Sequence, residues 1–246
     1  MGHSVPLTVN GYTYEAHYSD EACKTVLMPL LQTLARIHQR GEGRTIAFLA
    51  GPPAAGKSTL ALLLEALAPR VPGCDLQVIG LDGFHHYNDY LRTHELVRNG
   101  EAVSLAAIKG APETFDVEKF AYCLAQTKTG EPVAWPVYDR TVHNPREDAA
   151  LITAPIVLIE GNWLLLDESP WLELASIADY TIFLRAEESL LRERAVSRKA
   201  RGGLSRTEAE AHYERTDGPN IRRALEHSRP ADFVIQLTAD GDLVCV

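Results

Sequence analysis

One stretch of the sequence combines the residue types that bind a polyphosphate. Residues 51–58 read Gly-Pro-Pro-Ala-Ala-Gly-Lys-Ser, which fits the pattern G-x-x-x-x-G-K-[ST] of a phosphate-binding loop. In such a loop the lysine reaches the β- and γ-phosphates and the hydroxyl binds Mg²⁺. Lys57 is therefore a candidate catalytic residue and Ser58 a candidate magnesium ligand. The predicted nucleotide contacts are Gly51, Pro52, Pro53, Ala54, Ala55, Gly56, Lys57, Ser58 and Thr59.

The residues on either side predict the elements that hold this phosphate loop. Residues 45–50 are a continuous apolar run of strand length, and residues 59–67 are nearly all strong helix formers that stop before Pro69. Unpaired N–H groups and the helix dipole at a helix N-terminus both favour an anion. The alternative is a plain Gly/Pro turn between a strand and a helix, and the context favours phosphate binding.

Two carboxylates follow other predicted strands. Asp82 comes after an apolar run at 76–81, and Glu160 ends the run at 156–160. Because ligands collect at the carboxyl ends of parallel strands, we expect both side chains near the phosphate loop. Asp82 could take the proton of an attacking hydroxyl, and Glu160 could hold Mg²⁺ directly or through water. Alternatively, each is an acidic turn residue or a helix cap.

Three arginines are spaced to share one face of a predicted helix at 187–201. Arg194, Arg198 and Arg201 stand at i, i+4 and i+7. Like charges placed in this way repel each other unless an anion lies against them, so we expect a lid that closes over a bound triphosphate, with Arg194 and Arg198 as catalytic candidates. The alternative is an ordinary charged surface, with ion pairs to Glu187, Glu188 and Glu193.

The region between residues 84 and 145 holds the candidate contacts to a second substrate. His85 and His86 are adjacent, so they point to opposite sides of an extended chain, which disfavours a zinc site with His94. Trp135, Tyr138, Arg140 and His143 form an aromatic and basic cluster in a loop, which could grip a polyol or a ring, or could be packing. The substrate contacts that we predict are Phe84, His85, Tyr138, Arg140 and His143.

The alternation of short apolar strands with helices predicts an α/β fold with a mainly parallel sheet. Residues 87–116 show no strong periodic element. The remaining predicted elements are a hairpin at 5–14 that turns at Asn10-Gly11, a helix at 20–40 that Pro29 could kink, a helix at 117–126, strands at 133–138, 180–184 and 233–237, and a helix that opens with a capping box at 205–208.

The composition excludes several classes of protein. The chain has 246 residues, of which 46% are hydrophobic, and its net charge of −9 argues against a general nucleic-acid or membrane-surface binder. No apolar run approaches the length of a membrane span, and no signal peptide is evident. Four scattered cysteines suggest isolated thiols in a reducing compartment, so we expect a cytoplasmic protein; an oligomeric state cannot be read.

Several motifs together resemble a superfamily of kinases. The chain is similar to the uridine kinase, pantothenate kinase and phosphoribulokinase superfamily, and within it to bacterial nucleoside/nucleotide-kinase-like proteins that include candidate fructose-transport-system kinases. The resemblance runs from about residue 20 to the last strand. The segments that carry it are the phosphate loop, Asp82-Gly83-Phe84-His85, Lys109-Gly110-Ala111-Pro112-Glu113-Thr114-Phe115-Asp116, Tyr138-Asp139-Arg140 and Ile159-Glu160-Gly161-Asn162.

The resemblance implies a P-loop NTPase fold of three α/β/α layers with a helical lid, ATP and Mg²⁺ as cofactors, and phosphorylation of a hydroxyl on a small metabolite. It implies Asp82 as the base and the helix from Arg194 to Arg201 as the lid. We expect one domain over 1–246, with an N-terminal hairpin-helix extension (1–44) and a lid region at about 187–220.

Two departures from the family pattern bear on the substrate. Ala54 stands where many members have glycine, although a small residue still fits. His143 is followed by Asn144 and Pro145, whereas the uridine-kinase pattern has an arginine two positions after its histidine. This departure favours a sugar or polyol acceptor over a nucleoside or a pantothenate-type alcohol. Residues 217–220 (Asp-Gly-Pro-Asn) also resemble a segment of the closer relatives.

Two other classes of function remain as alternatives. A regulatory GTPase usually carries an Asn-Lys-x-Asp element for guanine, and none occurs in the sequence. A nucleotide-binding protein without catalysis would keep the phosphate loop but would release no ADP in response to an acceptor.

Overall fold

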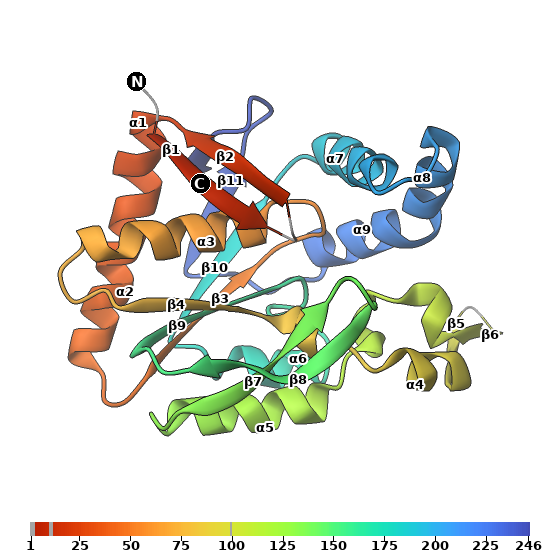
Figure 1. Cartoon of the computed structure of the whole chain (residues 1–246), viewed down its shortest axis with the longest axis horizontal. Helices are drawn as coiled ribbons and strands as arrows, with labels where there is room; N and C mark the ends of the chain where they lie inside the picture. Colours follow the sequence, from red (N-terminus) through yellow and green to blue (C-terminus); the bar gives the residue numbers. More distant parts are fainter. Residues whose placement is uncertain (1–2, 10–11, 99) are drawn as a thin grey trace.

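A mainly parallel sheet forms the centre of the molecule (Figure 1). The computed structural model describes residues 3–9, 12–98 and 100–246. In this part of the chain the strand order is β12-β11-β10-β3-β9-β4, with β12 antiparallel to β11 and the other neighbours parallel. The bounds are β3 Thr45–Ala50, β4 Leu76–Gly80, β9 Ile156–Gly161, β10 Tyr180–Arg185, β11 Phe233–Leu237 and β12 Leu243–Cys245. The predicted α/β fold is confirmed, and β12 is an additional strand.

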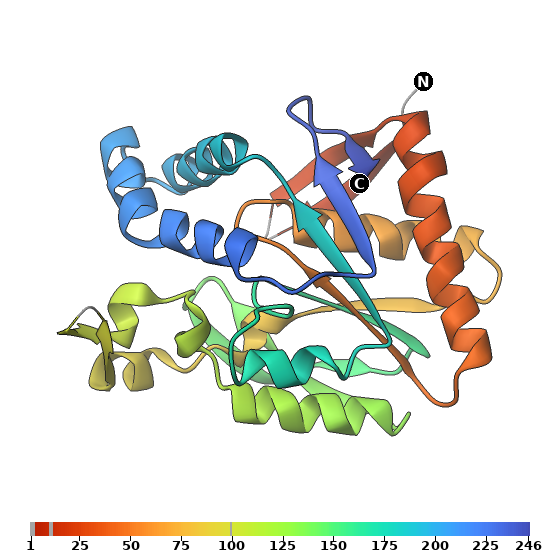
Figure 2. The same ribbon diagram turned by 180° about the vertical axis from the view of Figure 1, so that it is seen from behind.

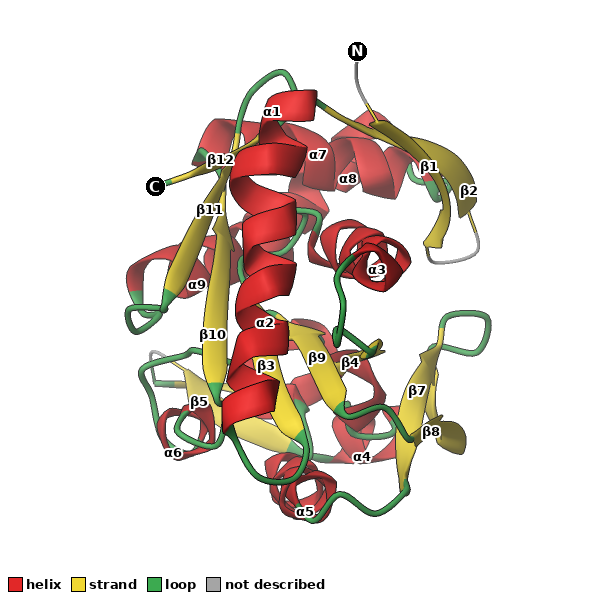
Figure 3. Ribbon diagram, turned by 90° about the vertical axis from the view of Figure 1, so that its left-hand side faces the viewer, coloured by secondary structure: helices red, strands yellow, loops and turns green. Residues whose placement is uncertain are grey.

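The sheet is covered on both faces, which explains why its strands read as continuous apolar runs. Ala47 and Leu49 of β3 face a core shared with α2 (Met28–Arg40) and α3 (Lys57–Leu67), whereas Phe48 faces a second core shared with α5 (Val117–Lys128) and α6 (Trp171–Ala175). Figure 3 shows α2 and α5 on opposite sides of the strands. The three predicted layers are therefore present.

The phosphate loop follows β3, the strand at which the order of adding strands to the sheet reverses. From β3 the chain runs through α3 (Lys57–Leu67) to β4 at one edge, whereas β10 and β11 lie on the other side of β3. In open parallel sheets the crevice at such a reversal is the usual ligand site. α3 begins at Lys57 itself, two residues earlier than predicted.

The long N-terminal helix contains one irregular turn. α1 (Asp20–Ala22) and α2 (Met28–Arg40) are joined by a π-helical turn at Cys23–Leu27. Pro29 is the second residue of α2, and because the helix continues through the π turn, its missing N–H removes one hydrogen bond from the helix. The predicted helix at 20–40 is confirmed, and the distortion expected near Pro29 is this π turn.

The N-terminal hairpin packs beside α3. β1 (His3–Val9) and β2 (Tyr12–Tyr18) pair antiparallel, as predicted, and the turn predicted at Asn10-Gly11 lies outside the described residues. The Ser19 N–H donates to Asp242 Oδ1 at 3.2 Å, which ties this extension to the C-terminal loop.

A second, two-stranded sheet contains the strand predicted at 133–138, which is confirmed, although the cluster around Trp135 and Tyr138 was expected to lie in a loop. β7 (Val133–Asp139) pairs antiparallel with β8 (Asn144–Ile152), which was not predicted. Trp135 and Tyr138 therefore belong to a strand, and only Arg140 and His143 lie in the connecting turn. The turn sits at the same end of the molecule as α9 (Figure 1).

The segment at 87–116, here called the insert, is ordered. It contains α4 (Asn88–Thr93) and a small antiparallel pair of strands, β5 (Glu95–Arg98) and β6 (Glu101–Ser104). The prediction of no strong element was wrong because each element is only four to six residues long. A separate small core holds the insert together through Leu91, Leu105, Ile108 and Ala111.

The remaining helices follow the sheet strands. α5 (Val117–Lys128) begins at the cap Asp116, and α6 (Trp171–Ala175) was not predicted. The lid segment, residues 187–220, contains α7 (Glu188–Arg201), α8 (Arg206–His212) and the start of α9 (Gly218–Glu226); the predicted capping box at Ser205 is present. Figure 2 shows the lid segment and the insert projecting from the same end of the molecule.

Candidate functional site

The backbone of the phosphate loop is shaped by two glycines and one alanine. A Cβ at Gly51 would lie 2.2 Å from the Leu184 carbonyl oxygen, so only glycine fits there. Gly56 precedes α3 with a φ of +102°, and Ala54 has a φ of +67°. The left-handed conformation costs a non-glycine residue about 1–2 kcal/mol, so Ala54 fits in space, as expected, but with backbone strain.

Lys57 is held in a buried position at the first residue of α3. Its ammonium donates to the Pro52 carbonyl at 2.9 Å and to Asn162 Oδ1 at 2.6 Å, and the side chain is 7% exposed. Burial lowers the pKa of Lys57 to about 8, while the charges of Glu160 and Asp82 pull it upward. The ammonium thus lies inside the loop, surrounded by oxygen acceptors of the kind that phosphate provides.

Ser58 and Glu160, the two residues predicted to hold magnesium, lie in direct contact. The Ser58 hydroxyl donates to Glu160 Oε1 at 2.7 Å. Burial raises the pKa of Glu160, and the positive charge of Lys57 opposes that rise. A hydroxyl and a carboxylate are ligands that Mg²⁺ prefers, and a buried carboxylate gains from a cation beside it. These two residues therefore fit a magnesium ion, as the sequence suggested.

Asp82 lies at the carboxyl end of β4, in a 3₁₀ turn at Leu81–Phe84. Its side chain is 41% exposed, and Oδ2 accepts a hydrogen bond from Arg140 at 3.2 Å. Asp82 acts electrostatically on the pKa values of both Lys57 and Glu160. The three side chains that the sequence proposed for one site are thus brought together at the ends of β3, β4 and β9.

A group of polar and aromatic side chains, here called the wall, lies between Asp82 and the insert. Its members are His85, Lys109, Phe115, Tyr138 and Arg140. His85 Nδ1 contacts the Asp82 carbonyl at 2.9 Å, and its ring lies 3.9 Å from that of Phe115 and 5.3 Å from that of Tyr138. Burial lowers the pKa of His85. Two cations, Lys109 at 5.1 Å and Arg140 at 5.9 Å, lie over the Tyr138 ring. Of the predicted substrate contacts, His85, Tyr138 and Arg140 share this wall.

The two remaining predicted substrate contacts behave differently. Phe84 is 1% exposed and packs against Phe120 and Trp135, with ring centroids 5.0 and 4.7 Å apart, so it is a core residue and the prediction of a substrate contact is corrected. His143 is exposed in the β7–β8 turn with a φ of +53°, and its carbonyl accepts from Lys109 at 2.7 Å. The contact between His143 and Lys109 is therefore made by the backbone carbonyl of His143 and not by its ring.

His86 belongs to a stack of rings on the insert. Its ring lies 4.1 Å from that of Tyr90, which in turn lies 3.7 Å from that of His94. Of the two adjacent histidines, His85 is therefore the one beside Asp82.

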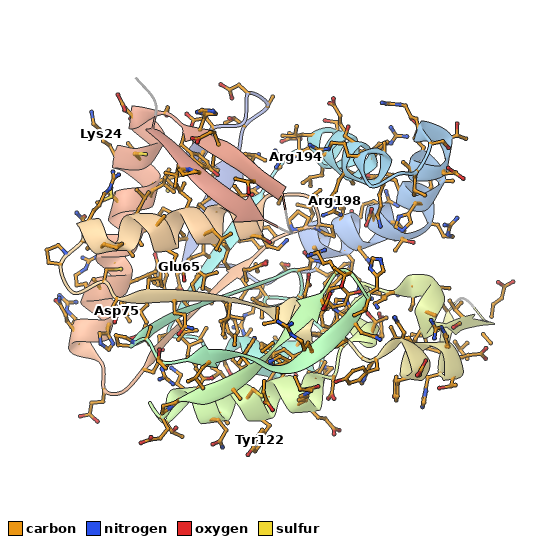
Figure 4. All side chains as sticks on the ribbon, viewed as in Figure 1. Lys24, Glu65, Asp75, Tyr122, Arg194 and Arg198 are labelled. Carbon is orange, nitrogen blue, oxygen red and sulfur yellow. The ribbon has the colours of Figure 1, made fainter. Side chains whose placement is uncertain are left out.

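One of the three predicted arginines is hydrogen-bonded to the phosphate loop, and a second acts on Lys57 through its charge. Arg194 Nε donates to the Ala54 carbonyl at 2.9 Å, and the exposed Arg198 lowers the pKa of Lys57 through its charge. Figure 4 labels both on α7. Arg201 is exposed near the end of α7, and no contact with the loop is observed for it in the described chain. Glu188, one of the alternative partners, pairs with Arg222 at 3.0 Å.

The structure adds two residues that the pattern alone did not single out. Asn162 Oδ1 accepts a hydrogen bond from the Lys57 ammonium. The Lys109 ammonium donates to Asn88 Oδ1 at 2.6 Å and lies over the Tyr138 ring. Burial lowers the pKa of Lys109. Both stand in segments that carry the family resemblance, and Asn162 directly follows the end of a strand, which is the signal that could have identified it.

With this geometry in place, comparisons with known proteins identify the family. The sequence pattern of the Phosphoribulokinase / Uridine kinase family matches residues 46–239. The uncharacterised protein YggC of Escherichia coli is 47% identical over 241 residues, which cover 96% of this chain and 97% of that protein. A candidate uridine kinase of Schizosaccharomyces pombe is 34% identical over 202 residues, covering 79% of this chain and 84% of that protein.

A solved structure gives the same answer. The crystal structure of a candidate fructose transport system kinase from Silicibacter sp. superimposes with a TM-score of 0.72 at 33% identity, covering 83% of this chain and 98% of that one. The chain belongs to the phosphoribulokinase / uridine kinase family. This kinase is therefore a phosphotransferase that uses ATP with Mg²⁺ and a small-molecule substrate with an alcohol group. That membership favours the kinase interpretation over a regulatory GTPase.

Two general features of the kinase complete the comparison with the sequence predictions. In the described residues, no helix is long and apolar enough to cross a membrane. Cys23, Cys74 and Cys123 are buried and Cys245 is exposed, and all four thiols are free, as the scattered spacing predicted.

Proposed function

We propose that this kinase transfers the γ-phosphoryl group of ATP to a hydroxyl of a small sugar or polyol. The observation that carries the proposal is the position of Asp82, a half-exposed carboxylate that acts electrostatically on both Lys57 and Glu160. A base beside a phosphate loop can receive the proton of an incoming hydroxyl while the nucleotide remains anchored.

Asp82 is the proposed general base. Arg140 donates to Oδ2 at 3.2 Å, which fixes the carboxylate so that Oδ1 can accept the hydroxyl proton. The turn that carries Asp82 packs directly against β7, because a Cβ at Gly83 would lie 1.9 Å from the Pro136 carbonyl oxygen. The close contact between this turn and β7 therefore fixes the position of Asp82.

Lys57, Arg194 and Arg198 are the proposed phosphate-binding cations. Lys57 would exchange its hydrogen bonds to Pro52 and Asn162 for phosphate oxygens, which are stronger acceptors. Ser58 and Glu160 would hold Mg²⁺, which supplies charge neutralisation on the phosphates. Catalysis in this account comes from positioning and charge, as expected for phosphoryl transfer.

The choice of a sugar or polyol rests on the wall beside Asp82. The wall offers an imidazole from His85, a phenol hydroxyl from Tyr138 and an ammonium from Lys109. Such hydrogen-bonding groups suit an acceptor that carries several hydroxyls. Pro145 stands where the nucleoside pattern has its arginine, and the neighbouring Asn144 side chain accepts from the Asn88 N–H at 2.9 Å. The printed title of the Silicibacter relative, a candidate fructose transport system kinase, agrees with this choice.

A nucleoside or pantothenate-type acceptor is the second candidate. It is favoured by the name of the Schizosaccharomyces pombe relative and by curated pantothenate kinases that are about 30% identical, such as the 31% of the Shouchella clausii enzyme. The aromatic rings of Phe115 and Tyr138 beside His85 could also receive a base.

The free thiols support a reducing compartment. Three of the four cysteines are buried without partners of their own kind, as is usual for chains that fold in reduced surroundings. We accordingly propose that the kinase works in the cytoplasm.

The test is acceptor-dependent ADP formation from MgATP with D-fructose, D-ribose, ribitol, glycerol, uridine and pantothenate. We expect a sugar or polyol to give the highest kcat/KM. Lys57→Ala should abolish turnover, and the control Lys24→Ala, an exposed lysine of the N-terminal helix (Figure 4), should not change it. GTP in strong preference to ATP, or no stimulation by any acceptor, would contradict the proposal.

A further inference from the structure

The ammonium of Lys109 is held in the same way as that of Lys57. The Lys57 ammonium donates to one backbone carbonyl and to one asparagine amide oxygen. The Lys109 ammonium donates to the His143 carbonyl at 2.7 Å and to Asn88 Oδ1 at 2.6 Å. Neutral oxygens of this kind position an ammonium without neutralising its charge, so an anionic oxygen is still a stronger acceptor for it. Lys109 therefore repeats the arrangement of the lysine that is placed to bind phosphate.

The charge of Lys109 is not balanced by a carboxylate of the protein. Lys119, a half-buried lysine of α5, forms an ion pair with Glu147. In the described chain no such ion pair is observed for Lys109, which is also half-buried. Burial and the charge of Arg92 lower the pKa of Lys109, so its ammonium lacks the stabilisation that a neighbouring anion would supply. A bound anion would supply it.

The turn that carries Lys109 is fixed to the segment that follows β9. The Gly110 N–H donates to the hydroxyl of Thr114, a fully buried residue, at 3.1 Å. The Gly110 carbonyl accepts from the indole N–H of Trp163 at 3.0 Å. Trp163 directly follows Asn162, which accepts from the lysine of the phosphate loop at 2.6 Å. Two consecutive residues after β9 thus connect this turn with the phosphate loop.

The contacts of one tyrosine ring place Lys109 on the same side of the site as the proposed base. Lys109 Nζ lies 5.1 Å from the centre of the Tyr138 ring, and the guanidinium of Arg140 lies 5.9 Å from it. Arg140 donates to Asp82 Oδ2 at 3.2 Å. The ring of His85, whose Nδ1 contacts the Asp82 carbonyl, lies 5.3 Å from the same tyrosine. Since Arg140 is paired with Asp82, Lys109 is the cation of this group that can receive an anion.

We propose that Lys109 binds an oxyanion of the phosphoryl acceptor, a carboxylate or a phosphate, while Asp82 takes the proton of one of its hydroxyls. This inference rests on the function proposed above and narrows it to sugars or polyols that carry an anionic group. An ammonium has three N–H donors, and Asn88 and His143 accept two of those of Lys109. The third donates to the oxyanion. A charge-assisted hydrogen bond is about twice as strong as a neutral one, which favours the anionic acceptor over its neutral counterpart.

The test compares pairs of acceptors that differ in one anionic group. The pairs are D-ribose with its terminal phosphate ester, glycerol with D-glycerate, and pantothenyl alcohol with pantothenate. ADP formation from MgATP gives kcat/KM for each compound. In at least one of the first two pairs, the wild type should prefer the anionic member by about 10- to 100-fold. The phosphate pair and the carboxylate pair distinguish the two sources of the oxyanion.

Variants of Lys109 test whether this lysine causes the preference. Lys109→Met removes the charge and should bring the ratio of kcat/KM between the anionic and the neutral member close to one, whereas Lys109→Arg keeps the charge and should retain most of the ratio. Lys119→Met is the matched control, because Glu147 already pairs with that lysine, and it should leave the ratio unchanged. If Lys109 only holds the insert to the β7–β8 turn, its loss should affect both members of a pair alike and leave the ratio as in the wild type.

Equilibrium binding separates this inference from the proposed function, because it needs no turnover. Calorimetric titration of the same pairs, with Mg²⁺ and a non-hydrolysable ATP analogue present, should show tighter binding of the anionic member by the wild type and not by Lys109→Met. If that result is found but no compound is phosphorylated, or if it is confined to the pantothenate pair, the sugar or polyol kinase is contradicted and the role of Lys109 is supported. A preference that Lys109→Met keeps, or no preference for the anionic member in either measurement, overturns the role of Lys109 even if neutral sugars are phosphorylated.

Discussion

The buried ammonium of Lys57 makes nucleotide binding by the free enzyme sensitive to pH. Its pKa of about 8 lies below the ordinary value of 10.5 because burial disfavours the charged form. Phosphate requires the charged form. Below pH 8 Lys57 is already protonated in the free enzyme. Above pH 8 Lys57 must take up a proton before it can bind the phosphates.

We therefore predict that the affinity for MgATP is constant from pH 6.5 to 7.5 and falls above pH 8, by up to about tenfold per pH unit. Calorimetric titration at each pH gives the dissociation constant. Lys57→Met should bind weakly and show no such fall. An affinity that stays flat up to pH 9.5 in the wild type would show that Lys57 remains charged throughout.

At this scale, the sequence identified residues whose role follows from a fixed motif and missed those whose role depends on orientation. Lys57 and Ser58 are placed by the loop, and Glu160 by the end of a strand, so all three meet. Phe84 is two residues from Asp82, but it turns into the core against Trp135, a contact formed with a segment more than fifty residues away. No local pattern reveals such a contact.

The position of the base depends on how two elements touch. The turn at Leu81–Phe84 packs on β7 with no space for a side chain at Gly83, where a Cβ would lie 1.9 Å from the Pro136 carbonyl oxygen. The indole N–H of Trp135 also donates to the Gly80 carbonyl at 2.9 Å. These contacts fix Asp82 relative to the sheet.

We predict that Gly83→Ala separates the turn from β7, lowers stability by about 2–4 kcal/mol and lowers turnover at least tenfold through displacement of Asp82. Gly41→Ala is the control, since its Cβ would meet only the Ile37 carbonyl oxygen at 3.4 Å. Denaturant unfolding and steady-state kinetics measure both effects. If Gly83→Ala matches the control in both, the rigid contact does not position the base.

Long apolar strands and helices were predictable, and short elements were not. Thr45–Ala50 and Ile156–Gly161 contain the apolar runs 46–50 and 156–159, which local sequence reveals. β8 carries four charged or amide residues at 144–148, so its pairing with β7 comes from tertiary structure alone. The insert likewise folds around its own small core, and its four-residue strands are too short to show periodicity.

For the whole molecule, the lid segment and the insert approach the site from the same end (Figure 2). Arg223 of α9, three residues after the lid segment, donates hydrogen bonds to Glu113 of the insert at 2.7 Å and to Glu168 at 2.9 Å. Arg194 already contacts the phosphate loop through the Ala54 carbonyl. We propose that nucleotide binding draws α7 closer, as expected for a lid.

A non-hydrolysable ATP analogue with Mg²⁺ should slow amide hydrogen exchange in α7 and in the phosphate loop at least tenfold. α5 packs on the opposite face of the sheet and should be unaffected. Arg194→Ala should keep the protection of the loop and lose most of that in α7. Protection of the loop with unchanged exchange in α7 would contradict a lid at residues 187–220.

The central claim is that Asp82 takes the proton of an acceptor hydroxyl beside an anchored triphosphate. Its most direct test is the rate of γ-phosphoryl transfer to the preferred acceptor by Asp82→Asn, with the exposed Asp75→Asn as control (Figure 4). We predict a loss of about 10²–10⁴-fold in kcat for Asp82→Asn, an ATP dissociation constant within a few-fold of the wild type, and no change in the control. Full turnover by Asp82→Asn would contradict the claim.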